Sequence, residues 1–248
     1  MHPPPLQGNL AQSAIRRLNA LRQLSDQAIA LLQQAIQQRI RRVGAGEDLA
    51  CEGDSIDSVR ILLSGWLCRY KTLEDGRRQI VNFVLPGDTC DAHVYLLSSM
   101  DHAIGTLTPA VYAEIPRGNF EELLAGDRSL AEAFWCETIV NIAMQREWTV
   151  NIGRRTALER VAHMLCEVFV RLQTVGLIED NTCTFPVTQM DMADATGLSV
   201  VHVNRTLQEL RNSGLIKLRD RVLTIVDAEA LTITALFSPD YLYTKRPG

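Results

Sequence analysis

One stretch of the sequence, residues 188–216, predicts two short helices joined by a tight glycine turn. Thr188 is a good N-cap for the first helix, because its hydroxyl can accept a hydrogen bond from a backbone N–H near the helix start. Gly197 follows this helix, where the chain must take a positive φ. Ser199 then caps a second helix, which Gly214 ends. This arrangement is typical of a helix-turn-helix, whose second helix enters the major groove of DNA.

The second helix has one apolar face and one polar face. The apolar face is formed by Val203, Thr206, Leu207 and Leu210, and the polar side carries Asn204, Arg205, Gln208 and Arg211. Arginine can make two hydrogen bonds to a guanine edge, and asparagine can do the same with adenine. An ordinary solvated helical hairpin is also rich in Arg and Gln. The two caps, the glycine and the two faces together favour DNA binding over that alternative.

The segment GLSVVHVNRTLQELRNSGLI resembles the C-terminal DNA-binding motif of the Crp/Fnr family of bacterial transcription regulators. It is more similar to members that carry V-H-V-N-R-T-L-Q than to the cyclic-AMP receptor protein. Upstream, GRRTALERVAHMLCEVFVRL looks like the first helix of the family's DNA-binding domain, and the glycine series before it resembles the family's β-roll. The resemblance implies an α+β chain: a cyclic-nucleotide-binding-like β-roll, a long dimerisation helix and a C-terminal winged helix-turn-helix.

The resemblance also implies roles for single residues. The DNA base-reading positions fall on Val200, Val201, Asn204 and Arg205, with His202 among them. Arg205 matches the family arginine that reads guanine. Val201 stands where the family usually has glutamate, and valine can contact a thymine methyl but cannot accept a hydrogen bond from cytosine. Phosphate contacts, which fix register rather than sequence, fall on Thr188, Gln189 and Ser199, to which we add Arg211.

Changes in hydrophobic pattern divide the chain into four parts. Residues 12–40 have an imperfect helical stripe, and short β-prone runs between turn residues over 42–116 indicate a small antiparallel barrel or sandwich. After Gly214, two short strands indicate a wing. The predicted domains are 1–41 (N-terminal extension and helix), 42–127 (β-roll sensor), 128–153 (dimerisation helix and hinge) and 154–248 (winged helix-turn-helix).

A long helix is predicted from about Arg128 to Ile152. Residues at 4-3 spacing form a coiled-coil-like seam along it: Ala131, Trp135, Thr138, Ile142, Gln145, Thr149 and Ile152. In the family this helix forms the dimer interface, so the resemblance implies a homodimer and a palindromic DNA site with half-sites about one helical turn apart. Packing on its own β-roll alone is the alternative. Gly153 is the expected hinge between the domains.

The expected effector pocket differs from that of relatives that bind cyclic AMP. Those relatives hold the ribose with the glutamate of a Gly-Glu pair and the phosphate with an Arg-Ser pair. Here Cys90 takes the glycine position, Asp91 takes the acid position, and residues 98–103, SSMDHA, contain no Arg or Lys. A buried phosphate without a cation is costly, and His102 is mostly neutral at pH 7. We therefore expect no tight binding of cyclic AMP, with a cyclic-nucleotide-dependent regulator as the disfavoured alternative.

The candidate effector pocket comprises Cys90, Asp91, His93, Met100 and His102. Thiolate and imidazole are good metal or haem ligands, so a redox- or haem-responsive sensor using Cys90, His93 and His102 is an alternative. A Cys/His hydrolase is disfavoured because no orienting motif accompanies these residues. No cysteine precedes Cys51 and no C-x-x-C pair occurs. We expect no cofactor, no metal and no enzymatic activity.

Charge and hydropathy set the remaining expectations. The net charge is −4, but residues 199–219 carry a local +3, which is a modest electrostatic footprint for DNA. No apolar run reaches the roughly 18 residues needed to span a bilayer, and the N-terminus has no secretory pattern. We expect a cytoplasmic protein whose partners are double-stranded DNA, a second copy of the chain and RNA polymerase, with no membrane association.

Overall fold

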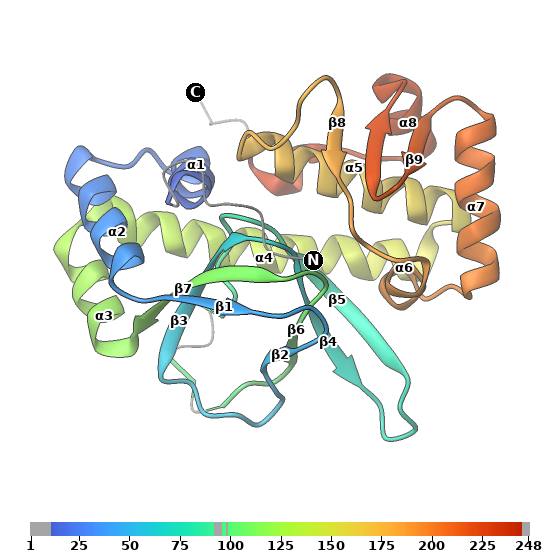
Figure 1. Cartoon of the computed structure of the whole chain (residues 1–248). Coiled ribbons are helices and arrows are strands. Elements are labelled where there is room, and N and C mark those ends of the chain that lie inside the picture. Colours follow the sequence, from blue (N-terminus) through green and yellow to red (C-terminus); the bar gives the residue numbers. More distant parts are fainter. Residues whose placement is uncertain (1–10, 92–95, 98, 245–248) are drawn as a thin grey trace.

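The computed structural model describes residues 11–91, 96, 97 and 99–244 (Figure 1). Its N-terminal part holds two helices, α1 (Gln12–Leu21) and α2 (Asp26–Gln38), so the single helix predicted over 12–40 is wrong. The chain leaves the helical conformation at Arg22, with φ −146° and ψ 132°. Ser25 then caps α2 by accepting a hydrogen bond from the backbone N–H of Ala28 at 2.9 Å. A capping residue inside the apolar stripe therefore restarts the helix in a new direction.

The β-roll consists of two antiparallel sheets. Its strands are β1 (Ile40–Val43), β2 (Asp48–Ala50), β3 (Ser58–Ser64), β4 (Leu67–Thr72), β5 (Arg78–Val84), β6 (Ala103–Thr106) and β7 (Ala110–Pro116). The sheet orders are β1-β7-β3 and β2-β6-β4-β5. Buried side chains such as Leu62, Leu67 and Ile104 fill the space between the sheets. The predicted antiparallel β-roll is thereby confirmed.

Helices α1, α2 and α3 (Arg117–Gly126) pack on the outside of the three-stranded sheet, around a core that includes Leu18, Leu32 and Phe120. The turn after β5 lies directly against α1. Gly87 has φ +100° there, and an added Cβ would lie 2.6 Å from the backbone oxygen of Ser13. Glycine at this position therefore permits both the turn and the close approach of α1.

Helix α4 (Arg128–Arg154) begins at Asp127, whose carboxylate accepts hydrogen bonds from the backbone N–H groups of Ser129 and Leu130. The helix runs through Gly153, so the hinge expected at that residue lies too early. The non-helical link is formed instead by Arg155 and Thr156. Thr156 and Glu159 form a capping box that starts the next helix, and this local signal sets the junction.

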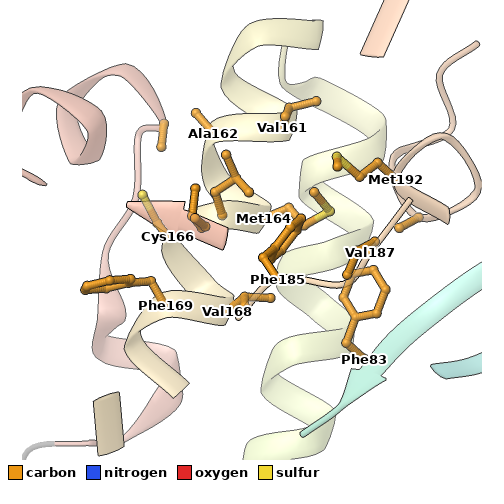
Figure 2. Close-up of a cluster of buried hydrophobic side chains, with 14 of the residues drawn as sticks. Phe83, Val161, Ala162, Met164, Cys166, Val168, Phe169, Phe185, Val187 and Met192 are labelled. Carbon is orange, nitrogen blue, oxygen red and sulfur yellow. The ribbon is translucent and has the colours of Figure 1, made fainter. Parts of the chain in front are cut away.

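The C-terminal domain begins with α5 (Ala157–Thr174) and contains a small sheet of order β8-β10-β9. Its other elements are β8 (Thr182–Thr184), α6 (Gln189–Thr196), α7 (Val200–Asn212), β9 (Ile216–Arg219), β10 (Val222–Ile225), α8 (Ala228–Thr234) and the 3-10 helix η2 (Pro239–Leu242). Strands β9 and β10 pair as the predicted hairpin wing. Figure 2 shows part of the buried core of this domain, to which Phe83 of the β-roll contributes together with Phe185 and Val187.

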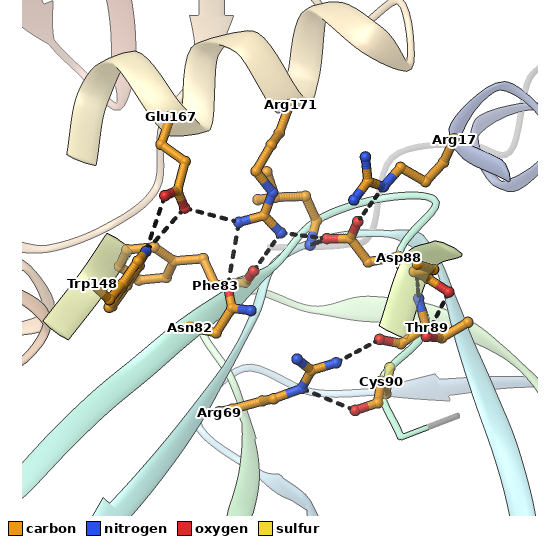
Figure 3. A network of polar contacts seen from close by, with 12 residues as sticks. Arg17, Arg69, Asn82, Phe83, Asp88, Thr89, Cys90, Trp148, Glu167 and Arg171 are labelled. Carbon is orange, nitrogen blue, oxygen red and sulfur yellow. Dashed lines mark hydrogen bonds and ion pairs between the residues drawn. The ribbon is translucent and has the colours of Figure 1, made fainter. Parts of the chain in front are cut away.

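A buried polar cluster, here called the interdomain network, joins the N-terminal helix, the β-roll and the C-terminal domain (Figure 3). Asp88 forms ion pairs with Arg171 of α5 at 2.6 Å and with Arg17 of α1 at 3.4 Å. Arg171 also donates to the backbone oxygen of Phe83, and Glu167 accepts from the indole N–H of Trp148 at 3.1 Å. Charges taken from three separate elements thus compensate one another away from water.

Among the helices that the structure describes, none combines the length and the apolar character required to cross a bilayer.

Candidate nucleic-acid interface and effector cavity

Short-range signals build the helix-turn-helix. The Thr188 hydroxyl accepts a hydrogen bond from the backbone N–H of Asp191, and the Asp191 carboxylate accepts one from the backbone N–H of Thr188. Together they form a capping box at the start of α6. Gly197 adopts the left-handed conformation with φ +66° and ψ 30°. Ser199 then caps α7 through the backbone N–H of His202. Val203, Leu207 and Leu210 are buried and hold α7 against the rest of the domain.

The face of α7 that points away from this core is open to solvent. Val201 is 69% exposed, and His202, Asn204 and Arg205 are exposed as well. A surface hollow of about 360 Å³ is lined by Gln189, Val200, Val201, Asn204, Arg205 and Gln208. Four of the predicted base-reading residues, Val200, Val201, Asn204 and Arg205, therefore lie together on this surface, and His202 is exposed but is not among the residues that line the hollow.

A second hollow lies between α6, α7 and the wing. It has a volume of about 210 Å³, and the polar residues that line it are Gln189, Arg211, Arg219, Asp220 and Arg221. Arg211 folds back and donates to the backbone oxygen of Leu207 at 3.0 Å, while Thr188 and Ser199 lie exposed near the helix starts. The predicted site did not include Arg219 and Arg221 at the wing turn. The sequence Arg219-Asp220-Arg221 at a predicted hairpin turn could have indicated two positive charges there.

Helix α4 presents a stripe of apolar side chains to solvent. Trp135 is 63% exposed, Ile139 52% and Ile142 50%. The opposite face buries Phe134, Met144 and Trp148 within the chain's own cores. Of the other predicted seam residues, Thr138 is half-buried, and Gln145 and Thr149 are exposed. The helix therefore packs on its own β-roll and still offers an unpaired apolar surface.

A cavity of about 440 Å³ lies between the β-roll and α4. The β-roll contributes Arg69, Lys71, Val81, Asp101 and His102, and α4 contributes Thr138, Asn141, Ile142 and Gln145. Of the predicted effector-pocket residues, His102 alone is among the lining residues that the structure describes. His93 lies outside the described residues, and Cys90 and Met100 are buried in the core of the β-roll.

Asp91 is likewise turned into the protein. One carboxylate oxygen accepts from the backbone N–H of Arg60 at 2.7 Å, and the other forms an ion pair with the Arg60 guanidinium at 2.6 Å. Of the described residues predicted for the pocket, Cys90, Asp91 and Met100 thus do not line this cavity. Strand register decides which side chains face the cavity, and a register cannot be read from composition.

Two cations that the sequence analysis missed, Arg69 and Lys71, line this cavity. Both are already engaged. Arg69 donates to the backbone oxygens of Thr89 and Cys90, and Lys71 contacts the Glu52 carboxylate and the backbone oxygen of Asp101. A bound phosphate would therefore compete with existing partners for these donors.

The ionisable side chains of Cys90 and His102, both predicted for the pocket, favour their uncharged forms. Burial, with the charge of Asp91 next, raises the pKa of the Cys90 thiol well above its ordinary value, so the reactive thiolate is disfavoured. Burial and the nearby Arg69 lower the pKa of His102, which therefore carries no charge near neutral pH. Among the described residues, no group of three or more His, Cys, Asp and Glu side chains is arranged to hold a metal ion.

Comparisons with known proteins cover both domains. The model of the Crp-like helix-turn-helix domain matches residues 159–232, and that of the cyclic nucleotide-binding domain matches residues 40–127. The nitrogen fixation regulation protein FixK of Bradyrhizobium diazoefficiens is 34% identical over 194 residues, which cover 75% of this chain and 78% of that protein. The transcriptional activator protein FnrL of Cereibacter sphaeroides is 30% identical over 189 residues, which cover 75% of each.

A solved structure is similar to most of this chain. The structure of FixK2 from Bradyrhizobium japonicum superposes with a TM-score of 0.70 at 25% sequence identity. The match covers 79% of this chain and 96% of that chain. Both domains and the helix between them therefore have counterparts in one known molecule.

Proposed function

Because this chain belongs to the Crp/Fnr family of transcription regulators, we propose that it binds a palindromic DNA site as a homodimer. That it is a DNA-binding transcription regulator follows from its relatives. The open polar face of α7 is the observation that carries the proposal, because it exposes Arg205 and Asn204, whose amide donates to the Gln189 side chain at 3.3 Å, on a surface that can face base edges. RNA polymerase is proposed as a further partner, since relatives are named transcriptional activators. The relatives are regulators rather than enzymes, and no catalytic role is proposed.

The V-H-V-N-R segment is proposed to read the half-site. Asn204 and Arg205 supply hydrogen bonds to adenine and guanine, and Val200, Val201 and His202 make the adjacent contacts. Val201 at the centre of the exposed face suits a thymine methyl. The residues proposed to bind phosphates and hold the helix in register are Thr188, Gln189, Ser199 and Arg211.

The apolar stripe on α4 is the proposed dimer interface. Trp135 and Ile142 are exposed side chains of a kind that normally lies buried, and with Thr138, Gln145 and Thr149 they run along one side of the helix. Pairing two copies along this stripe creates a two-fold axis. Two α7 helices then present themselves to successive major-groove half-sites, about one helical turn apart.

Arg205→Ala is expected to weaken binding to the specific site by about 1–3 kcal/mol and to relax one base position, because a bidentate contact to guanine is lost. Fluorescence anisotropy on a site selected from a random pool, with each base varied in turn, measures both effects. Arg211→Ala is the matched variant, since it removes the same charge from a proposed phosphate contact. It should weaken binding equally on all sequences. An equal loss for Arg205→Ala on every sequence would refute base reading by this residue.

Titration calorimetry with cyclic AMP is expected to show no binding in the micromolar range. Asp91 is occupied by Arg60, and the cavity cations Arg69 and Lys71 already have partners. DNA binding by the same preparation serves as the control for active protein. Micromolar binding would contradict this expectation.

The redox- or haem-responsive sensor is a less favoured alternative for the signal. Its cysteine, Cys90, is buried with a raised pKa, which disfavours thiolate chemistry. Visible absorption of the purified protein, or a dependence of DNA binding on thiol oxidation, would support this alternative over an effector-independent regulator.

A further inference from the structure

Strand β5 carries polar contacts to helices of the DNA-binding domain along its length. At its start, the Arg78 guanidinium bonds the Asp191 carboxylate at 2.6 Å and the Asp194 carboxylate at 2.8 Å, both on α6. Gln79 reaches the backbone oxygen of Ala195 at 3.4 Å. The first helix of the helix-turn-helix is therefore attached to the edge strand of the β-roll (Figure 1).

The other end of the same strand is attached to α5 and α4. Arg171 donates to the backbone oxygen of Phe83 at 2.7 Å and lies 3.3 Å from the side-chain oxygen of Asn82. From α4, Gln145 donates to the backbone oxygen of Val81 at 2.8 Å. Strand β5 thus connects the proposed dimer helix to the DNA-binding domain within a few residues.

The geometry of Arg78 suits a fixed orientation rather than a loose attraction. Its Nη2 and Nε atoms bond different carboxylates, and its guanidinium lies 5.5 Å from the centre of the Tyr70 ring. A planar guanidinium group that bonds two carboxylates and lies over a ring has little rotational freedom. The single ammonium group of lysine cannot reproduce this geometry. The preceding residue differs: the Arg77 side chain is largely exposed and forms an ion pair with Asp75 of its own turn.

Fixing α6 also fixes α7. Met192 and Ala195 of α6 share a buried core with Val203 and Leu207 of α7, so the two helices move as one unit. The bonds from Arg78 therefore constrain the orientation of the reading face relative to α4. In a dimer built on α4, this orientation determines the separation of the two reading faces.

We propose that Arg78 is a positioning residue for DNA recognition, which sets the half-site spacing that the dimer selects. The inference rests on the proposed palindromic homodimer. Arg78 acts through α6 and not by touching DNA. Its loss should leave each domain able to read a half-site while weakening the preference for one separation between half-sites.

The experiment uses the full chain and a set of palindromes whose half-sites are separated by the selected distance or by one or two base pairs more or fewer. A single half-site completes the set. For Arg78→Met we expect affinity for the preferred spacing to fall about tenfold, from the loss of two charge-assisted hydrogen bonds, and the other spacings to change little. Half-site affinity should stay within about twofold of wild type, because the reading residues are unchanged. Arg78→Lys should give an intermediate spacing profile.

Arg77→Met is the matched control and should keep the wild-type spacing profile. If Arg78→Met does not fold, as judged by thermal unfolding, Asp194→Asn is used to test the inference instead. This variant removes one carboxylate partner of Arg78 and leaves the α6 cap intact. A wild-type spacing profile in the variant that decides would overturn the inference. So would an equal loss on the half-site and on every palindrome, which indicates direct phosphate contact. If the wild-type chain itself shows no preference for palindromes, the proposed function fails, which is a distinct result.

Discussion

Asp88→Asn is expected to destabilise the folded chain by about 3–5 kcal/mol, because removing one partner of a buried ion pair leaves charge uncompensated. Asp88 faces two buried guanidinium groups, at 2.6 Å from Arg171 and 3.4 Å from Arg17. The Nη atoms of Arg17 have no hydrogen-bond partner among the described residues, so Arg17 depends strongly on this carboxylate and on the charge of nearby Glu137. Chemical denaturation gives the change in the free energy of unfolding.

Asp75→Asn is the matched control for this measurement. Asp75 makes an ion pair with Arg77 at 2.8 Å, but both side chains are exposed to solvent. Its loss should leave the unfolding midpoint unchanged, since exposed ion pairs contribute little. An Asp88→Asn protein as stable as wild type would show that the interdomain network adds no net stability.

Ile142→Asp is expected to convert the dimer to a monomer and to lower affinity for the palindromic site by about 100-fold or more, because the advantage of two linked reading helices is lost. The side chain is 50% exposed in the single chain, so the variant should still fold. A charge placed at the centre of the apolar stripe must be desolvated on dimerisation, which is costly. Light scattering gives the molar mass, and anisotropy gives the DNA affinity.

Ile233→Asp provides the control for the dimer test. Ile233 is also exposed, at 68%, but it lies on α8 in the DNA-binding domain and not on the stripe. This variant should keep the wild-type mass and affinity. A dimer that survives Ile142→Asp would show that another surface holds the copies together.

The helix-turn-helix was predictable from the sequence because its signals are local. Thr188, Gly197 and Ser199 each act on backbone groups within a few residues, and their roles need no distant partner. The exposed reading face followed from helical periodicity alone. Two local signals were still misread. Ser25, which caps α2, lies within an apolar stripe, and Gly153 lies inside α4, which ends only just before the capping box that starts α5.

The cavity between the β-roll and α4 was not predictable in the same way. Its walls come from β4, β5, the segment at residues 101–102 and α4, which meet only after the sheets have paired. Arg69 faces the cavity because of its register on β4, where a shift of one residue would turn it to the other face, whereas Asp91 lies in a bend outside the strands. The pairing of Asp91 with Arg60 spans 31 residues and has no local sequence signal.

The contacts of α1 affect the order in which the chain can fold during synthesis. Arg16 donates to the backbone oxygen of Val175, 159 residues later in the chain. Translation at roughly 5–20 residues per second puts about 10–30 s between the emergence of these two residues from the ribosome. Helix α1 therefore completes its contacts only after the chain has been synthesised as far as Val175.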